Sequence, residues 1–239
     1  MATPDPGGAS FDGAWLSAPN VSRHGISFWL LRTPVTVRYS FFLVGALLAQ
    51  QRSLGPALVW IATAAIAVLI HEMGHALTAR HYGQRPRVDL HGMGGVTTWS
   101  WLRPIAWHQR MLISLAGPGV GFVAGGSVFA AVATGHVPAA YLARVAVSDF
   151  LWVTLVWGVL NLLPILPLDG GGAMAEVLRR LDGPDRGLRA ARTVSCVAGA
   201  AGVALGVALG QVWLALLCGL FAWSNFQQLR GQGMGTLPA

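Results

Sequence analysis

The stretch from Gly55 to Leu77 is apolar and carries a single formally charged residue, Glu72. A run of this length can cross the hydrocarbon core of a bilayer as one helix, which needs about 20 mostly apolar residues. Lipid offers no partner to backbone N–H and C=O groups, so a spanning segment must bond them internally, as a helix does. The sequence therefore predicts a protein organised around membrane-spanning helices.

The overall composition agrees with a membrane protein. Hydrophobic residues make up 54% of the chain, charged residues make up only 10%, and the mean hydropathy is +0.56. Soluble domains carry about 25% charged residues, which excludes a typical soluble protein. The formal charge of +7 does not indicate nucleic-acid binding, because excess arginine in membrane proteins more often reports the orientation of loops.

Six segments have the length and polarity of candidate spans. They are residues 35–50, 55–80, 109–134, 145–167, 193–209 and 211–229. The expected fold is an all-α polytopic membrane protein with about six transmembrane helices. Because only Gly210 and Gln211 separate the last two segments, one long tilted helix over residues 193–229 is an alternative there.

The distribution of arginine supports six spans and orients them. All 16 basic residues are Arg, and cytoplasmic loops are enriched in such residues. A cytoplasmic N-terminus places every one of them except Arg52 and Arg144 on the cytoplasmic side. The absence of Lys, together with abundant Ala and Gly, suggests a GC-rich bacterial genome. We therefore expect a multi-pass protein of the bacterial plasma membrane with both termini in the cytoplasm.

Polarity divides the chain into three parts. Residues 1–34 form the only long polar stretch, and they lack the charged, apolar and cleavage regions of a signal peptide. We expect this part to be a cytoplasmic segment with a disordered start. Residues 35–230 form the membrane domain, with its core at residues 55–171, and residues 231–239 form a C-terminal tail.

The segment between the second and third spans has a different pattern. Residues 85–101 are too polar to cross a membrane, and the part from Gly92 to Trp99 mixes glycines with β-favouring residues. A short β-hairpin or a re-entrant loop is therefore predicted here.

Small residues recur at intervals of four in two of the predicted spans. These stripes consist of Gly117, Gly121 and Gly125, and of Gly202, Gly206 and Gly210. In a membrane this spacing lets two helices approach closely, so both stripes are expected to be packing surfaces.

The ionisable residues of the second span have the spacing of a metal site. His71 and His75 lie one helical turn apart, roughly 6 Å along the axis, so both imidazoles can reach one ion. Glu72 lies beside them without needing to be a ligand, which lets its carboxylate take a proton from zinc-bound water. An ionisable group in mid-membrane costs about 2.5–3.5 kcal/mol. The three ionisable side chains here therefore need a favourable interaction that offsets this cost, such as binding a metal ion. One zinc ion per chain is the expected cofactor.

A catalytic zinc ion usually has three protein ligands and an open position for water. His81 has the spacing of an extended histidine motif, but Thr78 stands where that motif has a turn-forming glycine. Asp169 is the stronger candidate because Pro164 and Pro167 should loosen the end of the fourth span just before it. Irregular backbone at membrane depth is tolerated where it lines a cavity. The alternative role of Asp169 is to cap the segment that follows.

Three motifs in order give the chain a family resemblance. They are His71-Glu72-x-x-His75, Ser114-Leu-Ala-Gly-Pro118 and Asn161-x-x-Pro164-x-x-Pro167-Leu-Asp169-Gly170. Together they resemble the site-2 protease family of intramembrane metalloproteases, peptidase family M50. The chain departs from many relatives in having no Asn soon after the second motif. It is similar to the compact six-span type without PDZ or CBS domains.

The resemblance implies a three-helix catalytic core and a role for each motif residue. Zinc would be held by His71, His75 and Asp169, and Glu72 would be the catalytic acid and base. Asn161 would help to hold the substrate backbone. The hairpin that contains Gly94 and Gly95 would present an edge to the substrate. Family members cut membrane-embedded substrates, often a membrane-tethered transcription factor or anti-sigma factor.

The expected function is therefore cleavage of a transmembrane segment of a membrane protein by zinc-activated water, with Glu72 as general base. A substrate helix must unwind before cleavage, and pairing with the hairpin would replace its lost hydrogen bonds. A metal-ion transporter is an alternative, because buried His and Asp also mark ion paths. A catalytically inactive binding homologue is another. Glu72 favours the protease, since a transporter has no particular need for an unliganded carboxylate beside the first His.

Overall fold

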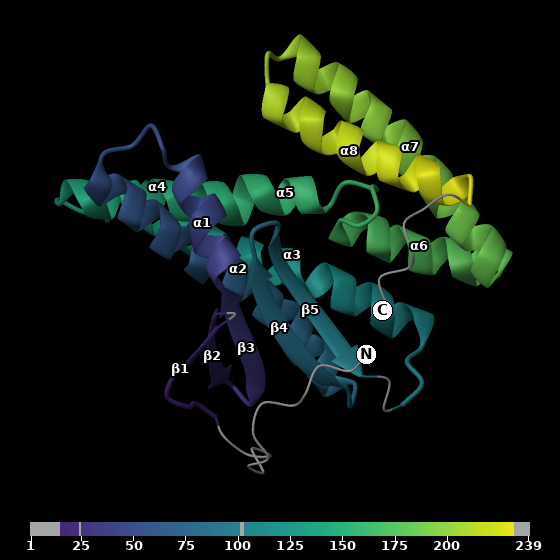
Figure 1. The fold of residues 1–239 in the computed structure, drawn as a ribbon, viewed down its shortest axis with the longest axis horizontal. Coiled ribbons are helices and arrows are strands. Elements are labelled where there is room, and N and C mark those ends of the chain that lie inside the picture. The colour runs from purple at the N-terminus through teal and green to yellow at the C-terminus, as the bar shows by residue number, and fades with distance from the viewer. Residues whose placement is uncertain (1–14, 24, 101–102, 232–239) are drawn as a thin grey trace.

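The computed structural model describes residues 15–23, 25–100 and 103–231, most of which are helical (Figure 1). Within these residues, four helical segments are long and apolar enough to cross a membrane: Leu54–His81 (α2), Trp107–Ala133 (α3), Tyr141–Asn161 and Pro184–Ala208 (α7). The two remaining predicted spans correspond to Tyr39–Leu48 (α1) and Val212–Leu229 (α8), which have 10 and 18 residues. A polytopic membrane protein is thus supported, whereas six spans are not confirmed.

The segment Tyr141–Asn161 is one helix of mixed geometry. It comprises α4 (Tyr141–Leu151), a π-helical turn η1 (Trp152–Val156) and α5 (Trp157–Asn161). A Cβ added to Gly125 of α3 would overlap the Thr154 side chain in the π-helical turn, so side chains of this turn pack directly on the α3 backbone. The helix ends at Asn161, before Pro164, as the prolines predict.

A five-stranded sheet is the main departure from the all-α expectation. Its strands lie side by side in chain order: β1 (Asn20–Ser22), β2 (Gly25–Leu30), β3 (Thr33–Arg38), β4 (Arg85–His91) and β5 (Gly94–Ser100). The β3–β4 pair is parallel and the other pairs are antiparallel. The β4–β5 pair confirms the predicted hairpin, and the alternative prediction of a re-entrant loop for this segment is wrong.

Strands β1 and β2 form ordered structure within residues 20–30 that the sequence did not predict, and β3 corrects the start of the first span. Alternate residues of β3, from Thr33 to Val37, are buried, which is the pattern of a half-buried strand. Leu31 and Arg32 form the tight turn before it, with φ of 48° and 60°, and Arg80 donates to the Leu31 carbonyl at 2.6 Å. The strand continues to Arg38, so the first helix begins only at residue 39. Residues 1–14, which include the start expected to be disordered, and tail residues 232–239 lie outside the described residues.

The sheet packs against the C-terminal half of α2. Val35, Val88 and Leu90 form a buried cluster with Met73 and Ala76 of α2. The hairpin β4–β5 lies along α2 (Figure 1). This packing brings a strand edge to the part of α2 that carries the histidines.

The last two helices form an antiparallel hairpin. A Cβ on Gly202 would meet Cys218, and a Cβ on Gly206 would meet Ala215, so residues later in α7 face residues earlier in α8. Gly210 makes the turn between them with φ of 65°. The alternative of one long helix is therefore wrong. The hairpin is joined to the other helices through α6 (Asp169–Asp182) and lies to one side of them (Figure 1).

Gly74 should be required for the packing of α2 on α3. A Cβ at this position would lie 2.5 Å from the Ala116 carbonyl oxygen and 3.0 Å from the Gly117 Cα. We expect Gly74→Ala to destabilise the protein by about 1–3 kcal/mol, the usual range for overpacking. The measurement is the melting temperature of the protein in detergent. Gly126→Ala in α3 is the control, because nothing lies within 4 Å of its Cβ position; equal melting temperatures for the two variants would contradict the prediction.

Candidate metal centre

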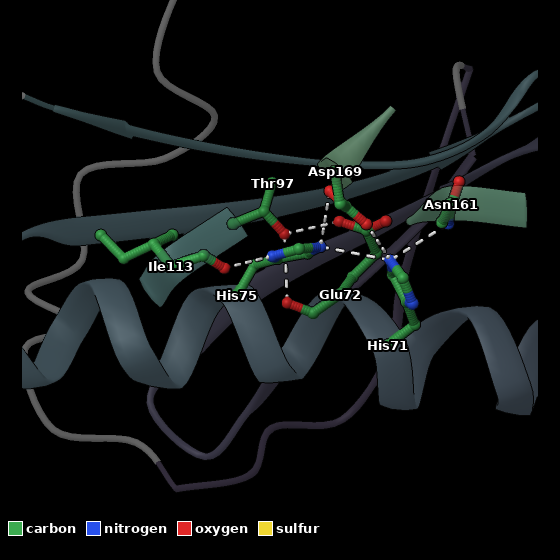
Figure 2. A network of polar contacts seen from close by, with 7 residues as sticks. All are labelled: His71, Glu72, His75, Thr97, Ile113, Asn161 and Asp169. Atoms are coloured by element: carbon green, nitrogen blue, oxygen red, sulfur yellow. Dashed lines mark hydrogen bonds and ion pairs between the residues drawn. The ribbon is translucent and has the colours of Figure 1, made fainter. Parts of the chain in front are cut away.

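Two histidines of α2 and the first residue of α6 converge on one point (Figure 2). His71 Nε2 lies 3.0 Å from Asp169 Oδ2, and His75 Nε2 lies 3.3 Å from Asp169 Oδ1. The two imidazole Nε2 atoms are 3.2 Å apart. The structure thus brings together the three residues predicted as ligands, and each offers one donor atom within 4.8 Å of the others.

The environment of His75 directs one ring nitrogen into this cluster. Its Nδ1 lies 2.7 Å from the Ile113 carbonyl oxygen of α3. A carbonyl can only accept a hydrogen bond, so Nδ1 carries the proton and Nε2 keeps its lone pair for a metal. A Cβ on Gly117 would overlap the imidazole ring. One member of the glycine stripe predicted for packing therefore also makes room for a candidate ligand.

The three residues fit a zinc ion. Two imidazole nitrogens and one carboxylate are a known ligand set of catalytic zinc, which leaves the fourth position open. Ligand atoms about 2.0–2.1 Å from a tetrahedral ion lie about 3.3 Å from one another. The two Nε2 atoms are 3.2 Å apart, and each lies 3.0 or 3.3 Å from a different oxygen of the Asp169 carboxylate, so the carboxylate faces both imidazoles at about this spacing. Bound zinc would also offset the burial of three ionisable groups.

Glu72 is buried beside the cluster but is not part of the group whose donor atoms converge. The Thr97 hydroxyl donates to Glu72 Oε2 at 2.7 Å and lies 3.1 Å from the Glu72 carbonyl oxygen (Figure 2). A Cβ on Gly95 would overlap the Glu72 side chain. Strand β5 therefore covers this carboxylate and fixes its orientation. Sequence reasoning missed Thr97, although the period of two in a strand puts it on the face of Gly95.

Two of the residues expected to contact a substrate, Asn161 and Gly95, lie beside His71 and Glu72. Asn161 Nδ2 at the end of α5 is 3.5 Å from His71 Nε2. Gly94 begins β5 with φ of 120°, and nothing lies within 4 Å of its Cβ position. Among the described strands, β5 pairs only with β4, so its other edge has free backbone groups. A strand edge and an amide side chain thus flank the cluster.

His81, the other candidate for the third ligand, lies outside the cluster, and so does the buried Asp149. His81 is exposed at the end of α2, with its ring against Tyr82. Asp149 is paired with Arg52 through contacts of 2.7 and 3.0 Å. The capping role considered for Asp169 is not seen, since Leu168 occupies the N-cap of α6 and no side chain caps it.

Comparison with known proteins supports a class of metalloprotease. The chain is 24% identical over 162 residues to a zinc metalloprotease of Methanocaldococcus jannaschii, covering 64% of this chain and 45% of that protein. It is 25% identical over 214 residues to a Synechocystis protein provisionally named a zinc metalloprotease, covering 83% of this chain and 54% of that protein. The chain therefore spans about half the length of these curated relatives. No protein-family model matches it.

The fold is shared with a solved site-2 protease. The site-2 protease from Methanocaldococcus jannaschii superposes with a TM-score of 0.58 at 21% identity, covering 93% of this chain and 99% of that chain. The similarities are to proteins named zinc metalloproteases and to the fold of a site-2 protease, and they support the same coarse class for this chain. Together they support the assignment of this chain to the site-2 protease family, peptidase family M50.

Replacing Asp169 and His81 separately should distinguish the two candidates for the third ligand. We expect Asp169→Ala to weaken zinc binding more than the roughly 10- to 100-fold typical of losing an outer-shell partner, because two imidazoles alone leave the ion underliganded. His81→Ala should retain zinc, since His81 lies outside the cluster. Metal analysis of the two purified variants is the measurement. Zinc retained in Asp169→Ala and lost in His81→Ala would reverse the assignment.

Proposed function

We propose that this protein is an intramembrane zinc metalloprotease that cleaves a peptide bond within a transmembrane segment of another membrane protein. The observation that carries this proposal is the convergence of His71, His75 and Asp169 beside the buried carboxylate of Glu72. Two of the three converging residues lie on α2, which is long and apolar enough to cross a membrane. The similarity to proteins named zinc metalloproteases supports the same class of chemistry.

The three converging residues would hold one zinc ion per chain. A zinc ion held by these residues would supply a Lewis acid and would lower the pKa of water to about 7. The Ile113 carbonyl keeps His75 in the orientation that this requires. Glu72 would accept the proton of the attacking water and deliver it to the leaving nitrogen. The hydrogen bond from Thr97 would hold one carboxylate oxygen and leave the other free for this transfer.

The substrate is proposed to bind as an extended strand. A transmembrane helix keeps its carbonyls in internal hydrogen bonds, so the segment around the scissile bond must unwind. The free edge of β5 offers backbone groups to such a segment by strand addition. Gly94 and Gly95 leave this edge open, and the Asn161 amide would hold the substrate backbone on the opposite side. A membrane-tethered transcription factor or anti-sigma factor is the kind of substrate we propose.

Replacing Glu72 by Gln should separate proton transfer from metal binding. The amide keeps an oxygen that can accept from Thr97 but cannot act as a base, so we expect about one zinc per chain and a loss of proteolysis of at least roughly 100-fold. Zinc content of the purified variant gives the first result. Proteolysis is followed by quantitative membrane proteomics of cells carrying Glu72→Gln, in which we expect a single-span protein to accumulate uncut. A variant without zinc would place Glu72 among the ligands.

We also propose that the protein lies in the bacterial plasma membrane with both termini in the cytoplasm. The antiparallel pairing of α7 and α8 supports this proposal, because a hairpin returns the chain to the side where α7 begins. Arg186 and Arg189 near the start of α7 and Arg230 after α8 mark that side as cytoplasmic.

Reporter fusions after Gly231 should test this orientation. We expect a reporter that works only in the cytoplasm to be active when fused after Gly231. The same reporter fused after Gly135, between α3 and α4, is the matched periplasmic control and should be inactive. A periplasmic C-terminus would mean that the α7–α8 hairpin does not cross the membrane twice.

A further inference from the structure

The backbone of Leu166 is held by two side chains from the C-terminal hairpin. Leu166 lies in the loop of residues 162–168 that joins α5 to α6, between Pro164 and Pro167. Its N–H donates to Ser195 Oγ of α7 at 2.9 Å, and its carbonyl accepts from Asn225 Nδ2 of α8 at 2.6 Å. Both side chains are buried, with relative exposures of 0% for Ser195 and 2% for Asn225.

Each of these side chains is also fixed to its own helix. Ser195 donates its single hydroxyl proton to the Ala191 carbonyl at 2.8 Å, which leaves its oxygen to accept from Leu166. Asn225 Nδ2 donates to the Phe221 carbonyl at 2.8 Å in addition to that of Leu166. The two residues therefore link the helices to the loop with defined donors and acceptors.

The loop and the first turn of α6 form one packed unit that carries Asp169. A Cβ on Gly170 would overlap the Leu162 carbonyl oxygen, and a Cβ on Gly171 would overlap the backbone of Ile165. Ile165 is only 1% exposed, and its carbonyl accepts from the N–H of Leu168 at 2.8 Å. Because the backbones touch, a shift of Leu166 would carry along Asp169, three residues later.

Among the described residues, few other contacts tie the hairpin to the helices around the cluster. The Trp213 ring of α8 lies 4.6 Å from the Trp157 ring of α5, measured between centroids. Otherwise the hairpin packs chiefly on itself and on α6, to one side of the molecule (Figure 1). The contact at Leu166 therefore lies on the path from the hairpin to the candidate ligand.

We infer that Ser195 and Asn225 are positioning residues for Asp169, so that the C-terminal hairpin sets the affinity of the metal site through the backbone of Leu166. This inference rests on the proposed function, because it takes Asp169 as a zinc ligand. Supporting hydrogen bonds of this kind hold a ligand in the orientation that the ion requires, and their loss lowers metal affinity.

The test compares Ser195→Ala and Asn225→Leu with the wild type, each as the full chain purified in detergent. Ser195→Ala removes one oxygen, and leucine is close to asparagine in shape, so both variants should fold. We expect zinc affinity, measured by competition with a chelator, to fall roughly 10- to 100-fold in each. We also expect the absorption spectrum of the Co²⁺-loaded protein to change, because that spectrum reports the arrangement of the ligands.

Cys218→Ala is the matched control. Cys218 lies on α8, has the same 2% exposure as Asn225, and packs against Gly202 of α7 away from the loop. We expect this variant to keep wild-type zinc affinity and the wild-type Co²⁺ spectrum even if its melting temperature falls.

Two results would overturn the inference: unchanged zinc affinity in both loop-contact variants, or an equal loss of affinity in Cys218→Ala. The second result would show that hairpin packing in general, and not the contact at Leu166, supports the metal site. Because the readout is metal affinity, failure of the inference leaves the proposed protease standing. Conversely, a wild type that binds zinc but cuts no substrate would overturn the proposed function alone.

Discussion

The cost of placing ionisable side chains inside a membrane governs the structure. Each such group in mid-membrane costs about 2.5–3.5 kcal/mol unless a partner compensates it, and His71, His75 and Asp169 lie together with Glu72 beside them. Their mutual contacts offset part of this cost, and the zinc ion proposed above would offset more of it. The neighbouring backbones must approach closely enough to exclude lipid, and glycine permits that approach at three places. Gly74 lets α2 and α3 touch, Gly117 admits the His75 ring, and Gly95 lets β5 cover Glu72.

Much of this organisation could be predicted because it is local in sequence. The spacing of His71 and His75 fixes a shared helix face, and the prolines before Asp169 mark the end of a helix whatever the tertiary structure. The hairpin of residues 85–100 was also visible in its glycines and β-favouring residues. These signals depend only on the conformational preferences of a few neighbouring residues, and the sequence is sufficient to identify them.

The parts that escaped prediction depend on partners far along the chain. Strand β3 pairs in parallel with β4, with Val35 opposite Val88. Two helices, α1 and α2, lie between these strands along the chain. Residues 35–38 precede an apolar helix directly, so the sequence alone assigns them to the same span. Only the pairing with β4 shows that they form a strand. Thr97 gains its importance only from Glu72, 25 residues away. Ser195 and Asn225 bond the backbone of Leu166, and no side-chain pattern identifies a backbone partner.

The irregular loop before Asp169 links these two kinds of constraint. A regular helix through residues 162–168 would bond its own backbone and would keep the following carboxylate on a face fixed by the helical period. The two prolines break that helix, and Asp169 begins a new helix, α6. The direction of the carboxylate is therefore set by the axis of α6 and not by that of α5. The break leaves backbone groups that lipid cannot satisfy, and Ser195 and Asn225 bond both polar groups of Leu166. The C-terminal hairpin is thus tied to the candidate metal site by the same feature that lets the carboxylate reach it.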